Sequence, residues 1–275
     1  MGERRVLAGY SYRRAYAAET YANRERIDVL EIVADHFFDR SRECRRELEM
    51  LAEHFTLVPH GLDLSLGSAE GLNEAYLTRF ADVVRRSGAR RWSEHVAFTR
   101  AGRISIGHLA PLPYTRETLD VLERNLERAR RAIGDLPCAL ENIAAPIALG
   151  GEFDEPEFLS ALVARTGCKL LLDVENVHAN ALNFQFDADA YLDALPRDAV
   201  VQLHLAGGEW NGATYVDSHA RTVSDDVWRL TRHAYERFAP EAAIVERDED
   251  LPPFAELLRE IEHARELGAL VPACP

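Results

Sequence analysis

The chain has 275 residues, of which 47% are hydrophobic and 28% charged, a balance typical of a folded protein and not of a disordered one. Its 46 acidic residues outnumber its 32 basic residues, and the formal net charge of -14 disfavours binding to nucleic-acid phosphates. The sequence has neither an apolar signal region nor a stretch long enough to span a bilayer. We therefore expect a cytoplasmic protein that binds neither nucleic acid nor membranes.

Strand-like and helix-like segments alternate along the chain. Short apolar runs typical of buried parallel strands lie near eight positions: Val6, Ile27, Thr56, Arg90, Cys138, Leu170, Val200 and Ala243. Amphipathic stretches typical of helices cover 41–55, 73–87, 116–133, 156–166, 188–194, 224–238 and 254 to about 267. Residues 99–115 and the polar segment through His219 interrupt this pattern, and we expect them to be long loops. Loops of such length inside a compact domain are usually functional.

Eight strands that alternate with helices predict an α/β fold, a single (β/α)8 TIM barrel. No linker or internal repeat divides the sequence, so we expect one domain over residues 1–275, with a tail from about residue 268 to 275. The four cysteines, Cys44, Cys138, Cys168 and Cys274, form no C-x-x-C pair, and we expect reduced thiols in a reducing compartment.

Six residues with metal-binding side chains stand where successive apolar runs end: His60, His95, Glu141, Asp173, His204 and Glu246. In a barrel of this kind the C-terminal ends of the strands meet at one face, where catalytic groups gather. A single such residue is commonly a buried histidine with a hydrogen-bond partner, a helix cap or an ion-pair partner. Six of them at six successive strand ends favour a catalytic metal site.

The composition of this site restricts the metal. Imidazole and carboxylate without thiolate favour iron, manganese or zinc over copper(I) or an iron–sulfur cluster. The number of carboxylates suggests more than one cation, because several buried anions would otherwise repel one another. Two loop motifs add further donors: N-V-H at Asn176 and His178, and D-S-H at Asp217 and His219.

Motifs spread over nearly the whole chain resemble those of the multinuclear non-heme iron-dependent oxidases, the family of the methanobactin-biosynthesis oxidase and its peptide-modifying relatives. The motifs are H-G-L-D-L-S-L-G-S-A-E from His60, W-S-E-H from Trp92, L-P-Y-T from Leu112, E-N at Glu141, L-L-D-V-E-N from Leu171, H-L-A-G from His204, D-S-H from Asp217 and E-R-D-E-D-L-P from Glu246. The resemblance implies a barrel of the xylose-isomerase-like superfamily.

The resemblance also implies how the metals are held. His60, His95 and a bridging Glu141 would bind one iron. Its neighbour would be bound by Glu141, Asp173, His204 and Glu246. A third position would use Asn176, Asp217 and His219, so that two or three iron ions are expected.

The activity that the resemblance implies is the oxidation of a side chain, cysteine, aspartate or similar, in a ribosomally made precursor peptide, with O2 as co-substrate. A companion protein that binds the leader segment of the peptide is the implied partner. Candidates for orienting the ligands or contacting the peptide are Glu70, His108, Glu175, His178, Arg247 and Asp248. For Glu70, Arg247 and Asp248, a salt bridge on the surface or in a loop is an equally good interpretation.

The chain departs from the usual motifs at places that border the cavity. Glu175 and His178 stand where the family commonly has Asn and Tyr, and H-L-A-G-G at Gly208 replaces the more frequent H-L-A-G-H. I-G-H-L, which contains His108, replaces a more usual N-D-L-L, and I-V-A-D-H-F follows the second strand instead of V-H-A-E-N-Y. These changes concern the substrate more than the metals.

The residues alone leave three other interpretations open. A zinc-dependent metallohydrolase or endonuclease of the same superfamily could use the same ligand order, although the net charge and the lack of a basic stripe speak against it. The chain could also be a metal-binding barrel without catalytic activity. A sugar isomerase fits the fold but has no support from the loop motifs.

Overall fold

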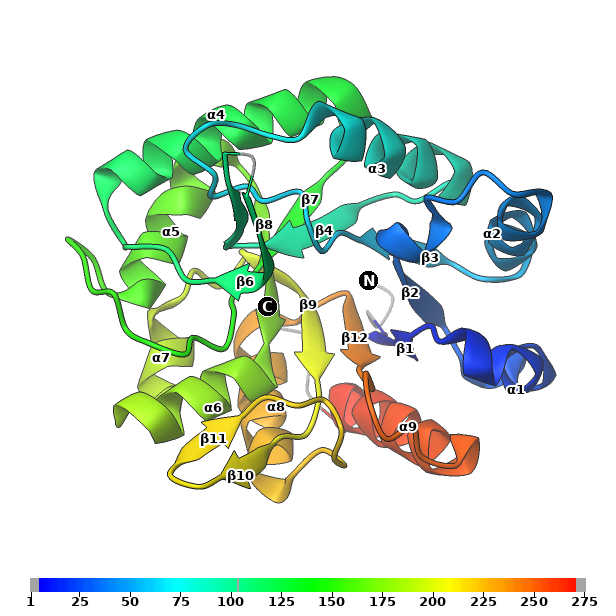
Figure 1. Cartoon of the computed structure of the whole chain (residues 1–275). Helices are drawn as coiled ribbons and strands as arrows, with labels where there is room; N and C mark the ends of the chain where they lie inside the picture. Colours follow the sequence, from blue (N-terminus) through cyan, green and yellow to red (C-terminus); the bar gives the residue numbers. More distant parts are fainter. Residues whose placement is uncertain (1–4, 103, 271–275) are drawn as a thin grey trace. The chain divides into compact units, whose positions relative to one another are not determined.

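The structure, a computed structural model, describes residues 5–102 and 104–270 (Figure 1). Eight parallel strands form a closed barrel, which confirms the predicted fold class; around the barrel they follow the order β1-β12-β9-β8-β7-β4-β3-β2. The strands are β1 (Leu7–Ser11), β2 (Val29–Val33), β3 (Leu57–His60), β4 (Trp92–His95), β7 (Cys138–Glu141), β8 (Lys169–Asp173), β9 (Val200–Leu205) and β12 (Ala242–Val245).

The chain divides into two compact units, and the division falls inside β2 and β8. Residues 32–170 form one unit, called here the central unit. Residues 1–31 and 171–275 form the other, called the terminal unit.

In the central unit, strands β3, β4 and β7 carry their helices as the sequence predicts. The helices are α2 (Arg42–His54), α3 (Glu74–Ser87), α4 (Arg116–Ile133) and α5 (Glu155–Thr166), with a 3-10 helix η3 (Ala34–Phe37) after β2. Asn73 caps α3 through its side chain, and Gly88 ends it in the left-handed conformation. Phe80 of α3 packs edge-on against the fully buried Trp92 of β4, which joins this helix to the sheet beside a strand end that carries a site residue.

In the terminal unit, β1 pairs with β12 and with the first part of β2. Its helices are η1 (Arg14–Tyr16), α1 (Ala17–Ala22), η2 (Arg24–Arg26), α6 (Val174–Phe184), α7 (Ala188–Ala194), α8 (Asp225–Phe238) and α9 (Phe254–Leu270). β1 and β2 approach so closely that a Cβ atom at Gly9 would lie 1.7 Å from the carbonyl oxygen of Val29. Only glycine fits this place.

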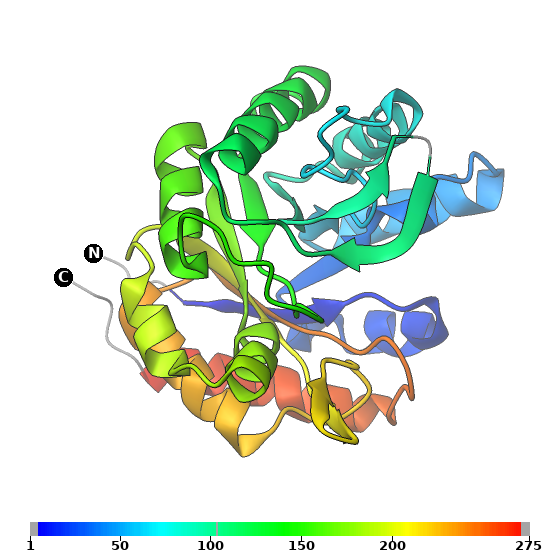
Figure 2. The ribbon, with the colours of Figure 1, turned by 60° about the vertical axis from the view of Figure 1, so that its left-hand side comes forward.

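Two expected loops contain β-hairpins instead. β5 (Phe98–Ala101) pairs with β6 (Ile104–Ala110), and β10 (Glu209–Asn211) pairs with β11 (Thr214–Val216). Figure 2 shows the first hairpin as two blue-green arrows, and Figure 1 shows the second beside α6. The turns use Gly102 and Gly212, both with positive φ, and Asn211-Gly212 is a common hairpin signal.

Helix α6 was also not predicted, because Val174, Asn176 and Val177, which have low helix propensity, lie in its first turn. The helix forms because the carboxylate of Asp173 accepts a hydrogen bond from the backbone N–H of Asn176 and so caps its first turn. Helix α9 extends to Leu270, three residues beyond the expected Leu267, and the rest of the expected tail, 271–275, lies outside the described residues.

The described cysteines are buried and form no disulfide: Cys44, Cys138 and Cys168. Cys274 lies outside the described residues. Burial raises the pKa of Cys138, and it raises that of Cys168 to about 12. These thiols therefore stay protonated at neutral pH, whereas metals bind the thiolate. Within the described ranges, no helix is both long and apolar enough to cross a membrane.

Candidate metal centre

The six predicted ligands stand at strand ends in the structure. His60, His95, Glu141 and Asp173 are the last residues of β3, β4, β7 and β8. His204 is the next-to-last residue of β9, and Glu246 directly follows β12. All six side chains are buried.

In the central unit His60, His95 and Glu141 come together, and we call them the His60 cluster. The two Nε2 atoms lie 3.3 Å apart. Glu141 Oε2 lies 3.5 Å from Nε2 of His60 and 3.4 Å from Nε2 of His95. Three potential ligand atoms from three strands thus point at one place.

The outer nitrogens of the two imidazoles are already engaged. Nδ1 of His95 lies 3.0 Å from Glu94 Oε1, and Nδ1 of His60 lies 2.9 Å from Ser93 Oγ. When Glu94 is ionised it can only accept, and the proton of a neutral His95 then lies on Nδ1. A neutral His95 therefore turns the lone pair of Nε2 toward His60 and Glu141.

This arrangement fits a bound cation. Metal–nitrogen bonds of about 2.1 Å in a tetrahedral site place neighbouring ligand atoms about 3.4 Å apart. The observed separations, 3.3 to 3.5 Å, match that value. When both Nε2 atoms are unprotonated, their lone pairs and the carboxylate oxygen repel one another at this distance, and a cation between them removes the repulsion.

Glu94, which the sequence analysis did not single out, holds the His60 cluster in place. It is 1% exposed, and its Oε1 accepts the backbone N–H of His95 at 2.8 Å as well as the ring N–H. Its Oε2 accepts the backbone N–H of Leu64 at 3.0 Å. Burial raises the pKa of Glu94, and the contacts with His95 partly counteract this. A carboxylate next to a candidate ligand inside a buried strand was the available signal.

In the terminal unit Asp173, His204 and Glu246 come together, and we call them the His204 cluster. Nδ1 of His204 lies 3.1 Å from Glu246 Oε2. Its other nitrogen, Nε2, lies 2.9 Å from Glu31 Oε2. His204 therefore offers Nδ1 to a metal, in contrast to the two histidines of the His60 cluster.

Glu31, which was also not predicted from the sequence, holds His204 in place through the ring nitrogen Nε2. It is fully buried in β2, and its Oε2 also accepts a hydrogen bond of 2.7 Å from the side-chain amide of Gln202. A single carboxylate inside the apolar run V-L-E-I-V was a signal of a buried polar contact, since a charge is rarely buried without a partner.

His219 borders the His204 cluster. Its Nε2 lies 2.7 Å from Asp217 Oδ1, and its Nδ1 lies 3.4 Å from Glu246 Oε2 and 3.1 Å from Asp248 Oδ2. Burial by itself lowers the pKa of His219, but the charge of Asp217 and the hydrogen bonds with Asp217 and Asp248 hold it well above its usual range. Asp248 also forms an ion pair with Arg13.

Two departures from the family pattern contact each other. A Cβ atom at Gly208 would lie 2.5 Å from Glu175 Oε1, so a side chain at position 208 would collide with Glu175. Glu175 is fully buried, and its pKa is raised to about 7 by burial and by the charge of Asp217, against the hydrogen bond with Tyr215. The two changes therefore depend on each other sterically.

The remaining candidates lie in different surroundings. Asn176 is buried in the first turn of α6, and His178 on the same helix packs edge-on against Tyr215. Arg247 is 2% exposed and forms an ion pair of 2.5 Å with Glu260, so it supports the backbone after β12 and does not reach outward. Glu70 and His108 are exposed.

Replacing Glu94 tests its positioning role. In Glu94→Gln an amide hydrogen must face either Leu64 N–H or His95 N–H, so His95 loses its fixed orientation. We expect metal affinity to fall by about tenfold, measured by anaerobic equilibrium dialysis against Fe(II). Glu53→Gln, at an exposed position of α2, is the control and should leave affinity unchanged. Wild-type affinity in the folded Glu94→Gln variant would refute the role.

Named relatives resemble the chain over most of its length. A UPF0276 protein of Rhizorhabdus wittichii is 37% identical over 242 residues, which cover 88% of this chain and 87% of the relative. A UPF0276 protein of Pseudomonas aeruginosa is 36% identical over 264 residues, covering 94% and 92%.

Solved structures share the fold at low sequence identity. A xylose isomerase domain protein from Planctomyces limnophilus superposes with a TM-score of 0.66 at 13% identity, covering 97% of this chain and 98% of its own. Endonuclease IV from Thermus thermophilus superposes with a TM-score of 0.60 at 20% identity, covering 94% and 99%. The fold is thus that of xylose-isomerase-like barrels.

One family matches residues 7–269, a range that includes every residue of the two clusters. The chain belongs to this family, described as the RiPP precursor modification enzyme MbnB/TglH/ChrH.

Proposed function

We propose that the chain is a multinuclear non-heme iron-dependent oxidase that uses O2 to modify a residue, cysteine, aspartate or similar, of a ribosomally synthesised precursor peptide. The observation that carries the proposal is the pair of buried clusters, each made of nitrogen and oxygen ligands, in a chain whose family modifies such precursors. Ligands of this kind suit iron, and the described thiols are protonated and buried elsewhere.

In this proposal the His60 cluster holds one iron through two Nε2 atoms and a carboxylate. The His204 cluster holds a second through Nδ1 of His204 and the carboxylates of Asp173 and Glu246. When bound, iron supplies the reaction with O2 and leaves coordination positions for an atom of the peptide. As the sequence resemblance implies, Glu141 would also serve the second iron.

The chain's own residues contribute orientation and exclusion of water. Glu94 keeps the ring proton of His95 on Nδ1 and so leaves Nε2 available. Glu31 engages Nε2 of His204 and directs Nδ1 to the metal. Because these groups are buried, they are already oriented before the substrate binds, and little reorganisation is needed during the reaction.

Asn176, Asp217 and His219 are proposed as a third iron position. The ion pair between Asp217 and His219 supports it, since His219 also lies beside Glu246 and Asp248. Metal binding there would replace the proton that these carboxylates now hold on His219.

A zinc-dependent hydrolase is the second candidate, because nitrogen and oxygen ligands of this kind also bind zinc. The chain is similar in structure to endonuclease IV. At 20% identity that similarity establishes the fold alone. The net charge of -14 disfavours a nucleic-acid substrate. A barrel that binds metal without turnover is the third candidate.

Metal and oxygen measurements separate these candidates. Protein purified without oxygen should contain about two or three iron ions per chain, and O2 should be consumed when the short peptide encoded beside its gene is added. The modified peptide is detected by mass spectrometry. Zinc at full occupancy together with cleavage of a DNA duplex would reject the oxidase, and iron without oxygen consumption would support the non-catalytic barrel.

The shared role of Glu141 has its own test. Glu141→Gln removes a negative charge that both irons would use, so we expect iron content to fall by more than one ion per chain, measured by elemental analysis. Glu236→Gln, at an exposed position of α8, is the matched control. Loss of one ion only would show that Glu141 serves the His60 cluster alone.

A companion protein that binds the leader segment is part of the proposal, and the cytoplasm is the proposed compartment. The protein encoded next to this chain's gene should co-purify with it when both are expressed together, at a stoichiometry measured by analytical ultracentrifugation. Two separate species at micromolar concentrations would count against a stable partner.

A further inference from the structure

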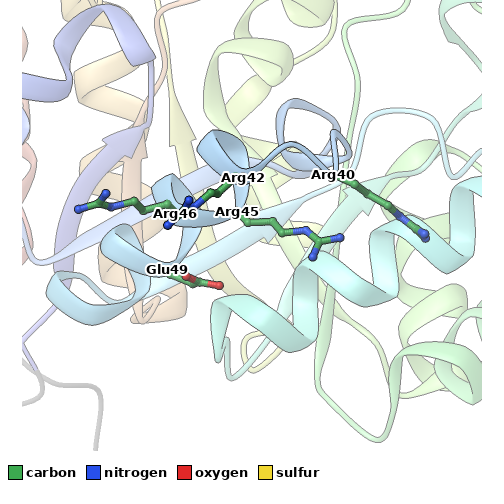
Figure 3. Close-up of a pocket in the computed structure, with 5 residues that line it drawn as sticks. All are labelled: Arg40, Arg42, Arg45, Arg46 and Glu49. Carbon is green, nitrogen blue, oxygen red and sulfur yellow. The ribbon is translucent and has the colours of Figure 1, made fainter.

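Four exposed arginines gather at the start of α2: Arg40, Arg42, Arg45 and Arg46. With Glu49 they line an open hollow of about 470 Å³, which Figure 3 shows in close-up. We call them the arginine patch. The patch stands out in a chain with an overall charge of -14.

The guanidinium groups of the patch are not neutralised by the chain itself. Within residues 5–102 and 104–270, none of the four has a carboxylate partner within 4.0 Å. Other exposed arginines of the central unit do have one, for example Arg85 with Asp82 and Arg116 with Glu152. The positive charge of the patch is therefore available to another molecule.

Their position is also unfavourable for the helix. α2 begins at Arg42, and the positive end of the helix dipole repels cations in the first turn. Arg42 further stands three and four residues before Arg45 and Arg46, a spacing at which like charges repel. Glu49, which stands four residues after Arg45 and three after Arg46, offsets part of this repulsion, but no such residue follows Arg42. Binding an anionic partner would offset the remainder.

Hydrogen bonds link the segment before the patch to the loop that follows His60. Asp35 accepts hydrogen bonds from the hydroxyl of Tyr76, at 2.7 Å, and from the backbone N–H of Leu62, at 3.3 Å. Phe38 packs edge-on against Tyr76. In a barrel the start of each helix lies on the face where the preceding strand ends. The patch therefore lies at the end of the central unit that carries the His60 cluster.

The arrangement of the side chains restricts the ligand. In Figure 3, Arg40 and Arg45 extend to one side of the helix and Arg42 and Arg46 to the other. A chain with several spaced carboxylates can contact both pairs at once, and arginine binds carboxylates well.

We propose that the arginine patch is a docking surface for a carboxylate-rich segment of the peptide substrate, held at the face where the His60 cluster lies. That the segment belongs to the substrate rests on the proposed function. The contact of the patch with spaced carboxylates rests on the charges and positions of the four arginines.

The test uses the metal-loaded full chain and a fluorescein-labelled hexaglutamate peptide, with binding measured by fluorescence anisotropy at low salt. Arg42→Gln/Arg46→Gln and Arg40→Gln/Arg45→Gln should each weaken binding by about fivefold, because each removes two exposed charge contacts. Arg85→Gln/Arg131→Gln removes the same charge at the far ends of α3 and α4 and should change binding less than about twofold.

Each other outcome overturns the proposal. Equal weakening in the control variant would mean that only overall charge matters. Loss of hexaglutamate binding in only one of the two patch variants, together with competition by inorganic phosphate, would mean that the patch is a site for a small anion. Tighter, patch-dependent binding of a labelled oligonucleotide or of anionic lipid vesicles would assign the patch to another class of partner.

Two further measurements keep the result interpretable. The patch variants should not lower the thermal midpoint, since they remove repulsive charges from a helix start. They should also keep the iron content of the wild type. If hexaglutamate binds through the patch but no peptide is oxidised, the proposed function is wrong and the docking surface is confirmed. If the peptide is oxidised but the patch variants bind hexaglutamate as tightly as the wild type, the docking surface is wrong and the proposed function is confirmed.

Discussion

The rest of the site depends on one electrostatic constraint, the crowding of unshared electron pairs in a buried place. In the His60 cluster two imidazole nitrogens and a carboxylate oxygen lie within 3.5 Å of one another. Without a cation this arrangement is unfavourable, because water is excluded and cannot screen the repulsion. The barrel tolerates it because hydrogen-bonded strands, not the side chains themselves, fix the positions. A metal that binds here relieves the repulsion between the ligand atoms, and this relief adds to its affinity for the site.

A second layer of buried carboxylates decides which nitrogen of each histidine is available. Glu94 takes Nδ1 of His95, and Glu31 takes Nε2 of His204, so the two histidines present opposite ring nitrogens. These carboxylates add negative charge to clusters that are already anionic, which opposes folding in the absence of metal. The same charge makes the imidazoles better electron donors to a cation. Folding stability and metal binding are therefore linked in this chain.

The barrel and its six strand-end ligands could be predicted because both follow from local patterns: apolar runs, helical periodicity and the rule that parallel strands end at one face. Glu94 and Glu31 each carried a signal in the sequence, a carboxylate inside a buried strand, but the histidine that each contacts becomes known only in the folded structure. The hairpin of β10 and β11 was missed for another reason, since its Asn211-Gly212 turn was present in the sequence but was read as loop. Helix α6 begins directly after Asp173, a candidate ligand, and the capping role of Asp173 was not recognised because the residue was interpreted as a metal ligand.

The distribution of charge suggests an order of events at the His60 face. In the absence of metal, the carboxylates of the two clusters repel an acidic peptide, whereas the arginine patch attracts it. Binding of metal ions removes much of the repulsion while the attraction of the patch remains. An acidic segment should then dock more tightly after the metals than before them. In such an enzyme the metals serve the binding of the substrate as well as its oxidation, because the same buried anions that hold the cations would otherwise keep the peptide away.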